Sequence, residues 1–146
     1  QETADFIAVD NSLYYIQSAI QLRKTDMEKN QIDLKQLLFI IKENKKMNAN
    51  LILDEGCLLT VNDSKPLVKI INYIINYFDQ FIDEALEISL DLNPENYALT
   101  FLGYTRETEF PPLSGQLDDA LNDYNASLQT SHEEDRYYQI RILFSR

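Results

Sequence analysis

The sequence has few of the residues on which chemistry usually depends, with three glycines, one cysteine, one histidine and no tryptophan in 146 residues. Because Cys57 is the only cysteine, the chain cannot form an internal disulfide, and its apolar neighbours predict a buried thiol in a reducing compartment. A single histidine, His132, leaves few ways to build a serine or cysteine catalytic triad. Hydrolase chemistry at Ser114, Ser127 or Cys57 is therefore disfavoured.

Long apolar runs and positive charge are also scarce. The longest apolar candidate, residues 67–82, is interrupted by Asn72 and Asn76, so no segment approaches the ~18 residues of a membrane span. Thirteen Lys and Arg face 24 Asp and Glu, and the net charge of −11 repels nucleic-acid phosphates and anionic membranes. We predict a cytoplasmic protein without a nucleic-acid partner and without a membrane contact in this segment. The dispersed acids form either a solvated surface or a face for a basic partner.

Apolar residues at helical spacing predict four helices. The first carries a stripe of Leu13, Ile16, Ile20 and Met27. The second begins with a capping box, since Asp33 precedes a glutamine by three positions. The third has a wide apolar face, which predicts a central and deeply buried helix. The four helices are expected at 11–29, 33–47, 64–82 and 116–129.

Alternating and short apolar runs predict the strands. Two alternating runs, 86–92 and 97–102, are separated by a turn sequence and predict a hairpin. The short runs 51–53 and 57–61 have the spacing of two strands joined by a tight turn. A last strand is expected at 138–144, after a polar loop.

These elements predict one α/β domain, a two-layer sandwich in which a mixed sheet of about four or five strands packs on helices. The helices at 33–47, 64–82 and 116–129 cover the sheet, and the helix at 11–29 stands apart. Residues 103–115 contain two prolines and no periodicity, so they are expected to form a loop. No linker long enough to divide the domain is visible.

Two stretches, "IDLKQLLFIIKEN" and "NANLILDEGCLLTVNDSKPLVKIINYIINYF", resemble the beginning of the ATP-binding domain of bacterial sensor histidine kinases. In that family a helix starting with an aspartate and a leucine leads to a strand hairpin, and then to a helix with two asparagines four apart. Asn72 and Asn76 are similar to that pair, and their spacing places both on one helix face. The resemblance implies such a domain over 32–146. Residues 1–31 would correspond to the second helix of the kinases' dimerisation hairpin.

The nucleotide-binding loops of the family have no counterpart in this sequence. The family binds adenine through an aspartate-x-glycine loop, and a glycine-rich loop lets backbone N–H groups approach the phosphates. The corresponding stretch, "GYTRETEFPPLSGQL", has no aspartate and two glycines, Gly103 and Gly115. Asp79 replaces a basic residue, and residues 1–50 contain no phosphoacceptor histidine. The resemblance therefore implies a degenerate domain with no cofactor, in which Asn72 and Asn76 are vestigial.

Several polar residues have two interpretations. Asn76 either holds Mg²⁺ as in the family or is structural, since an isolated amide without phosphates binds Mg²⁺ poorly. His132, beside the acidic residues 133–135, is either a metal ligand or phosphoacceptor, or an exposed residue of a polar loop. Glu107 and Glu109 are either paired carboxylates for acid and base chemistry or solvated side chains.

The tyrosines are numerous for a small core, with nine in the chain beside seven phenylalanines. Tyrosine is favoured at protein interfaces because it presents a large rigid area with a polar tip. Ordinary use in the core and on the sheet is the alternative. The residues in question are Tyr14, Tyr15, Tyr73, Tyr77, Tyr104, Tyr137 and Tyr138.

The sequence thus indicates a signalling or adaptor domain that acts through protein contacts and is not an enzyme. The expected partner is a protein, a response regulator or a kinase by resemblance, and a homodimer is expected through the first helix. The alternative is a phosphotransfer or histidine kinase component that still binds ATP through an altered lid. Fold resemblance alone does not separate these functions.

Overall fold

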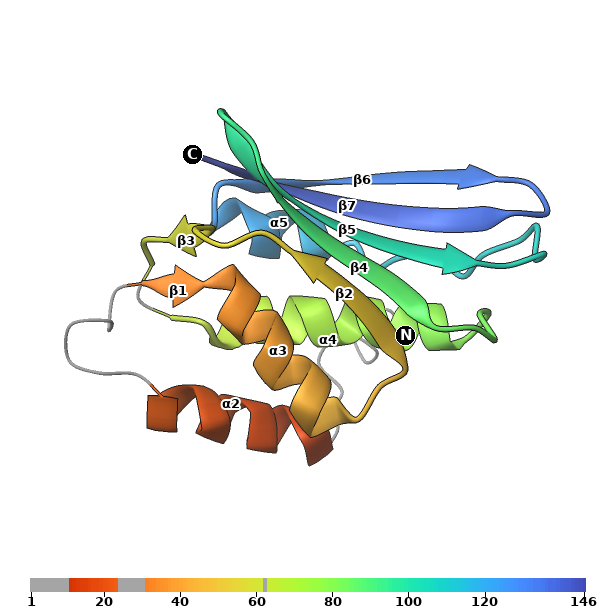
Figure 1. Cartoon of the computed structure of the whole chain (residues 1–146). Helices are drawn as coiled ribbons and strands as arrows, with labels where there is room; N and C mark the ends of the chain where they lie inside the picture. The colour runs from red at the N-terminus through yellow and green to blue at the C-terminus, as the bar shows by residue number, and fades with distance from the viewer. Residues whose placement is uncertain (1–10, 24–30, 62) are drawn as a thin grey trace.

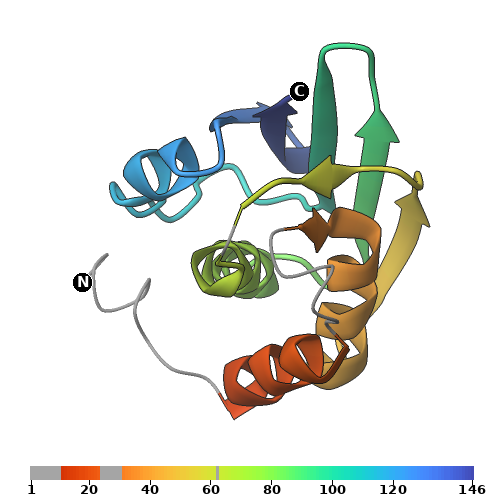
Figure 2. The ribbon, with the colours of Figure 1, turned by 90° about the vertical axis from the view of Figure 1, so that its left-hand side faces the viewer.

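The computed structural model describes residues 11–23, 31–61 and 63–146, with a twisted sheet on one side and helices beneath it (Figure 1). A central helix runs below the sheet and is flanked on both sides by further helices (Figure 2). The helices are α2 (Asn11–Arg23), α3 (Leu34–Lys45), α4 (Lys65–Asp79) and α5 (Leu117–Asn122). The strands are β1 (Ile32–Asp33), β2 (Ala49–Leu53), β3 (Leu58–Leu59), β4 (Leu86–Leu92), β5 (Asn96–Tyr104), β6 (Ala126–Glu133) and β7 (Tyr137–Ser145).

The main sheet has five strands in the order β2-β4-β5-β7-β6. Strand β2 runs parallel to β4, and the other neighbours are antiparallel, so the predicted mixed sheet and the β4–β5 hairpin are confirmed. The predicted hairpin between 51–53 and 57–61 is wrong. Strand β2 joins the main sheet, while β3 pairs with β1 in a separate two-stranded sheet. Gly56, at φ 89°, provides the turn that separates them.

Helix α3 begins and ends with the capping groups that its sequence supplies. The Asp33 carboxylate accepts hydrogen bonds from the backbone N–H groups of Lys35 and Gln36, at 3.1 and 3.4 Å. At the other end Lys46 adopts the left-handed conformation, and its N–H donates to the Lys42 carbonyl. The Asp33 cap confirms the predicted start of the helix. The Lys46 cap ends it and turns the chain toward β2.

Helix α4 is buried over nearly its whole length and circumference. Ten of its 15 residues are buried, and Ile74 and Phe78 have no exposed surface. The inward residues of the strands pack on it, since Leu86, Ile88 and Leu90 of β4 alternate with half-buried or exposed residues. The prediction of a central helix is therefore confirmed.

The predicted helix at 116–129 is only half right. Helix α5 ends at Asn122, and residues 126–133 form strand β6, which pairs with β7 from Ala126 opposite Phe144 to Glu133 opposite Tyr137. The left-handed conformation of Asn125, at φ 51°, separates the helix from the strand. The expected polar loop at 129–135 is thus mostly strand, because β6 is an edge strand whose polar residues give little alternation.

Helix α2 does not stand apart from the domain, contrary to our expectation. It packs against α3 and α4 on the side away from the sheet (Figure 1), and Leu13, Ile16 and Ile20 are buried there. The stripe that suggested self-association is therefore occupied within the chain, and Met27 lies outside the described residues. Within the described parts of the chain, no helix is both long and apolar enough to cross a membrane.

Replacement of Ile74 tests the central position of α4. Ile74→Asp places an unpaired charge at a site without exposed surface, which costs several kcal/mol against a total stability of about 5–15 kcal/mol. We expect loss of cooperative unfolding in urea, followed by circular dichroism. Ile52→Asp is the matched control, because Ile52 is 73% exposed, and it should unfold cooperatively. A cooperative Ile74→Asp variant would contradict the central role of α4.

Candidate functional site

The two asparagines of the resemblance lie on α4 but in different surroundings. Asn72 is 5% exposed, and Asn76, one turn later, is exposed at the surface. Their spacing of four places them on the same side of the helix. Only Asn76 is therefore directly accessible to a solute.

The loop after β5 is held against α4 by two tyrosine hydroxyl groups. Tyr77 donates to the Pro111 carbonyl at 2.7 Å, and the Ser114 N–H donates to the Tyr73 hydroxyl at 2.9 Å. Tyr73 and Tyr77 are one turn apart, so both hydroxyls reach the loop from one flank of α4. Both rings are buried, and desolvation raises the pKa of Tyr77, which keeps its hydroxyl protonated as a donor.

A third tyrosine, Tyr124, fixes the beginning of α4 to the segment that follows α5. The Tyr124 hydroxyl donates to the Asp63 carbonyl at 2.8 Å and accepts from the Leu67 N–H at 3.0 Å. Burial raises the pKa of Tyr124 to about 12. The hydroxyl thereby satisfies one of the N–H groups that the start of a helix leaves unpaired.

Aromatic rings from other parts of the domain pack against Phe110 of the same loop. The Phe110 ring lies 4.5 Å from the Tyr138 ring and 5.1 Å from the Phe81 ring, measured between centroids. His132 lies in β6, not in a loop as we expected, and its ring is 5.6 Å from Phe110 and 6.4 Å from Tyr138. The loop is therefore fixed by hydrogen bonds on one flank and by ring contacts on the other.

The two glycines near this loop differ in their surroundings. A Cβ atom on Gly103 would come within 2.7 Å of Ile82 and 2.8 Å of Phe78, so glycine is required for the close approach of β5 to the end of α4. Gly115 is exposed and lies just before α5. The absence of a side chain at Gly103 therefore has a packing reason.

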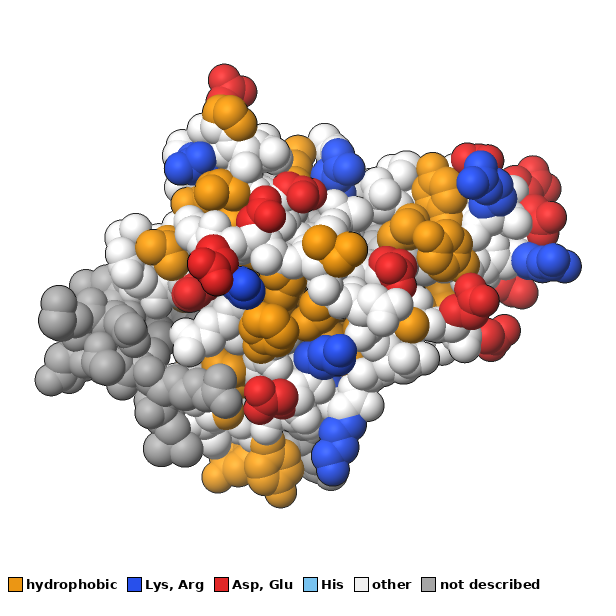
Figure 3. Space-filling view, viewed as in Figure 1, with side chains coloured by type: hydrophobic (Ala, Val, Ile, Leu, Met, Phe, Trp, Pro, Cys, Tyr) orange, Lys and Arg blue, Asp and Glu red, His pale blue; other side chains and the backbone are white. Residues whose placement is uncertain are grey.

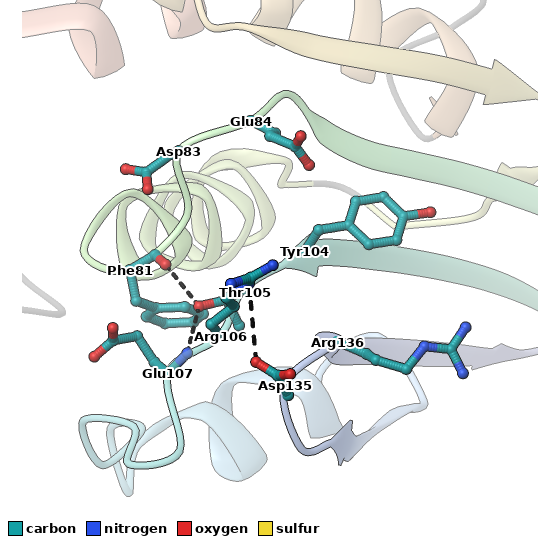
Figure 4. A pocket seen from close by; sticks show the side chains of 9 residues that line it. All are labelled: Phe81, Asp83, Glu84, Tyr104, Thr105, Arg106, Glu107, Asp135 and Arg136. Atoms are coloured by element: carbon teal, nitrogen blue, oxygen red, sulfur yellow. Dashed lines mark hydrogen bonds and ion pairs between the residues drawn. The ribbon is translucent and has the colours of Figure 1, made fainter.

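A polar cavity of about 480 Å³ lies where α4 ends (Figure 4). Thr105 organises one wall, because its hydroxyl donates to the Phe81 carbonyl at 2.9 Å and accepts from the Glu107 N–H at 3.1 Å. The Arg106 guanidinium lies 3.9 Å from the Asp135 carboxylate, and both side chains are largely exposed. The lining residues are Phe81, Asp83, Glu84, Tyr104, Thr105, Arg106, Glu107, Asp135 and Arg136. Charged residues of both signs line this cavity, so it suits a polar group better than an apolar one.

The remaining predicted candidates are dispersed. Cys57 is buried, Ser114 is buried within the loop contacts, and Ser127 is exposed on β6. Glu107 lines the polar cavity whereas Glu109 does not. In the parts that the structure describes, no group of three or more His, Cys, Asp or Glu residues is placed to hold a metal ion.

The tyrosines divide between the two interpretations. Tyr73, Tyr77 and Tyr138 are core residues, whereas Tyr14 and Tyr15 are 68% and 60% exposed on α2. Sequence reasoning missed the contacts of Tyr73 and Tyr77 to the loop, because their partners lie 41 and 34 positions away. It also missed Arg106 and Asp135, which no spacing in the sequence connects.

Comparison with solved structures places this arrangement among known folds. The histidine kinase AdeS of Acinetobacter baumannii superposes with a TM-score of 0.63 and 12% identity over 92% of this chain and 75% of that one. The histidine kinase domain of the Escherichia coli osmosensor EnvZ gives 0.63 and 10% over 83% and 91%. A bacterial phosphotransferase gives 0.50 and 11% over 97% and 91%. No sequence-family model matches, and no curated protein sequence matches significantly.

The chain therefore has the fold of a histidine kinase ATP-binding domain. With identities of 10 to 12%, the likeness concerns the fold and not the activity. In the described structure, α4 is the helix that carries the asparagine pair of the resemblance. The loop over 105–116 joins β5 to α5.

Removal of the Tyr77 hydroxyl tests whether it holds the loop. Tyr77→Phe leaves the Pro111 carbonyl without its donor, and we expect a loss of about 1 kcal/mol in the free energy of unfolding. Trypsin should also cleave faster after Arg106, whose side chain is 90% exposed at the start of the loop. Tyr15→Phe on α2 is the control and should change neither value. Equal cleavage rates in the two variants would contradict the role of Tyr77.

Asp79 predicts a pH dependence of stability. Desolvation raises the pKa of this carboxyl, and the positive charge of Lys45 opposes the shift. Asp79 is also the last residue of α4, where the helix dipole disfavours negative charge. Because the folded-state pKa is raised, the native state binds more protons, and the contribution of Asp79 to stability is lost as pH rises through that pKa.

Asp79→Asn should therefore stabilise the domain at pH 7, by about 0.3–1 kcal/mol, a value limited by the exposure of the side chain. The gain should disappear below the ordinary aspartate pKa of about 3.9. Urea unfolding across the pH range measures it, with Asp91→Asn as a control of equal charge change. A gain that persists at low pH would exclude titration of Asp79 as its cause.

Proposed function

We propose that this domain is a non-catalytic signalling or adaptor module that acts through protein contacts and does not use ATP. The observation that carries the proposal is that the 105–116 loop is hydrogen-bonded to α4 through Tyr73 and Tyr77. In the kinase resemblance, backbone N–H groups of this region face phosphates. Here the Ser114 N–H donates to the Tyr73 hydroxyl, and the Phe110 and Leu113 side chains of the loop pack against the core.

The residues present do not suit Mg²⁺ and ATP in the way that the resemblance requires. Of the three contributions to nucleotide binding, the adenine-binding aspartate and the glycine-rich loop have no counterpart in the sequence. The third, the asparagine pair, is vestigial in our proposal, with Asn72 buried and Asn76 at the surface. Loss of each buried recognition contact costs ~1–3 kcal/mol, so two losses weaken binding by about one to four orders of magnitude.

The partner we propose is a protein, a response regulator or a kinase of a two-component system. Support comes from the fold shared with histidine kinases and from the charge of −11, which favours a partner with a basic contact surface. Cytoplasmic location and the boundary between residues 31 and 32 are part of the same proposal. The homodimer through the first helix stays a prediction, although the stripe that motivated it is buried.

The alternative is a phosphotransfer or kinase component that still binds ATP through an altered lid. It is favoured by the exposure of Asn76 on α4 and by the likeness to domains that are named as histidine kinases or phosphotransferases. Under this alternative the loop would have to leave Tyr73 and Tyr77 when nucleotide enters.

Thermal unfolding with and without millimolar ATP and Mg²⁺ separates the two functions. A ligand at 100 times its Kd stabilises the native state by ~2.7 kcal/mol, which for a domain of this size raises Tm by several degrees. We expect ATP with Mg²⁺ to raise Tm no more than Mg²⁺ alone does. A rise that Asn76→Ala abolishes, and that the exposed control Asn122→Ala retains, would contradict our proposal and support the alternative.

A further inference from the structure

Strand β2 forms one edge of the main sheet and has an unused row of backbone groups. In Figure 2 it is the outermost strand of the sheet, and none of the described helices or strands lies beyond it. The Asn48 carbonyl and the Asp54 N–H point toward β4, where they bond Leu86 and Leu90. Because backbone groups alternate along a strand, those of residues 49, 51 and 53 point outward. Among the described residues, none bonds them.

This edge lacks the features that normally prevent strand pairing. Residues 49–53 read "ANLIL", without charge or proline, and the strand has no bulge. Ile52 is 73% exposed beside the edge, and hydrophobic side chains interrupt the charged surface on this face of the molecule (Figure 3). The opposite edge, β6, is protected by contrast, because its residues 127–133 are almost all polar.

The sequence around β2 is complementary to itself in the antiparallel direction. Pairing centred on Leu51 would place Leu51 opposite its copy and residue 49 opposite residue 53, so that the outward groups of these three positions pair with one another. Ile52 would then lie beside Asn50 of the second copy. Glu55, two residues after β2, is 86% exposed although its carboxylate lies 3.2 Å from the Lys35 ammonium of the same chain. In this register it would lie opposite Met47 of the other copy, next to exposed Lys46. Opposite charges thus meet at both ends of the pair.

We propose that β2 is a self-association edge, at which two copies of this chain join their sheets about a twofold axis. The second copy is favoured over an unrelated strand because β2 is preceded by Lys46 and followed by Asp54 and Glu55, so that two antiparallel copies bring opposite charges together at both ends. Helix α2 is not needed for this association, since its apolar stripe is buried within the chain. The proposal is independent of whether the domain binds ATP.

The association should be weak. One strand pair covers much less than the ~1,200 Å² of a stable interface, and each copy carries a charge of −11. We therefore expect a Kd of about 10–100 µM at physiological salt. Higher salt should strengthen the dimer, since it screens the overall repulsion more than the short-range backbone bonds.

Sedimentation equilibrium of the whole chain tests the edge with two lysine substitutions of equal charge change. Ile52→Lys adds a charge beside the β2 edge and should raise Kd by about tenfold or more. Gln129→Lys adds the same charge to the exposed face of β6 and should leave Kd unchanged. Thermal unfolding at low micromolar concentration verifies that both variants are folded. A wild-type chain that stays monomeric to about 0.5 mM, or equal effects of both substitutions, would overturn the proposal.

A charge exchange tests the antiparallel direction. Lys46→Glu and Glu55→Lys each place like charges at both ends of the pair, and each should raise Kd by about two- to fivefold. The double variant exchanges the two charges and should return Kd to the wild-type value. A double variant that is weaker than either single variant would exclude this pairing. Glu55→Lys also removes the ion pair with Lys35, but Glu55 is 86% exposed and such surface pairs contribute about 0–1 kcal/mol, so the fold should stay intact.

Discussion

Helix α4 is apolar on nearly every side, and the rest of the domain is arranged to exclude water from it. The inner face of the sheet covers one side, α2 and α3 cover a second, and α5 with the loop over 105–116 covers a third. A helix with this composition is not stable at a surface, because most of the stability of a helix in a protein comes from burial of its apolar side chains. The layers, the position of α2 and the path of the loop all follow from this requirement.

The polar tips of the tyrosines adapt this apolar helix to an irregular loop. A loop leaves N–H and C=O groups that need partners when it packs against a core. Tyr73 and Tyr77 supply an acceptor and a donor from buried rings, so the loop packs closely without unpaired backbone groups at these points. A histidine kinase fold is thus compatible with a loop that rests on its own domain, which is the physical basis of the adaptor function that we propose.

The two edges of the sheet differ in composition, and this difference is the basis of the self-association that we propose. Strand β6 is polar along its length, whereas β2 is apolar with an exposed isoleucine at position 52. Backbone groups at an apolar edge are poorly hydrated, so pairing with another strand is favoured there. The apolar stripe of α2 is buried against α3 and α4, so the self-association that we propose uses the sheet edge and not this stripe.

The sequence alone determined the elements whose signal is local. Helical spacing located α3 and α4, alternation located β4, β5 and β7, and together they predicted the two-layer fold. The resemblance to kinase domains rested on two sequence stretches and the asparagine pair on α4. Asp33 as a helix cap was readable because the cap and its partners are adjacent. The tertiary structure alone decided what depends on distant partners. It placed β2 beside β4 rather than β3, turned residues 126–133 into a strand along β7, buried α2, and joined Tyr77 to Pro111. Periodicity records which face of a segment is buried but not which segment buries it, and a polar edge strand such as β6 has hardly any such face.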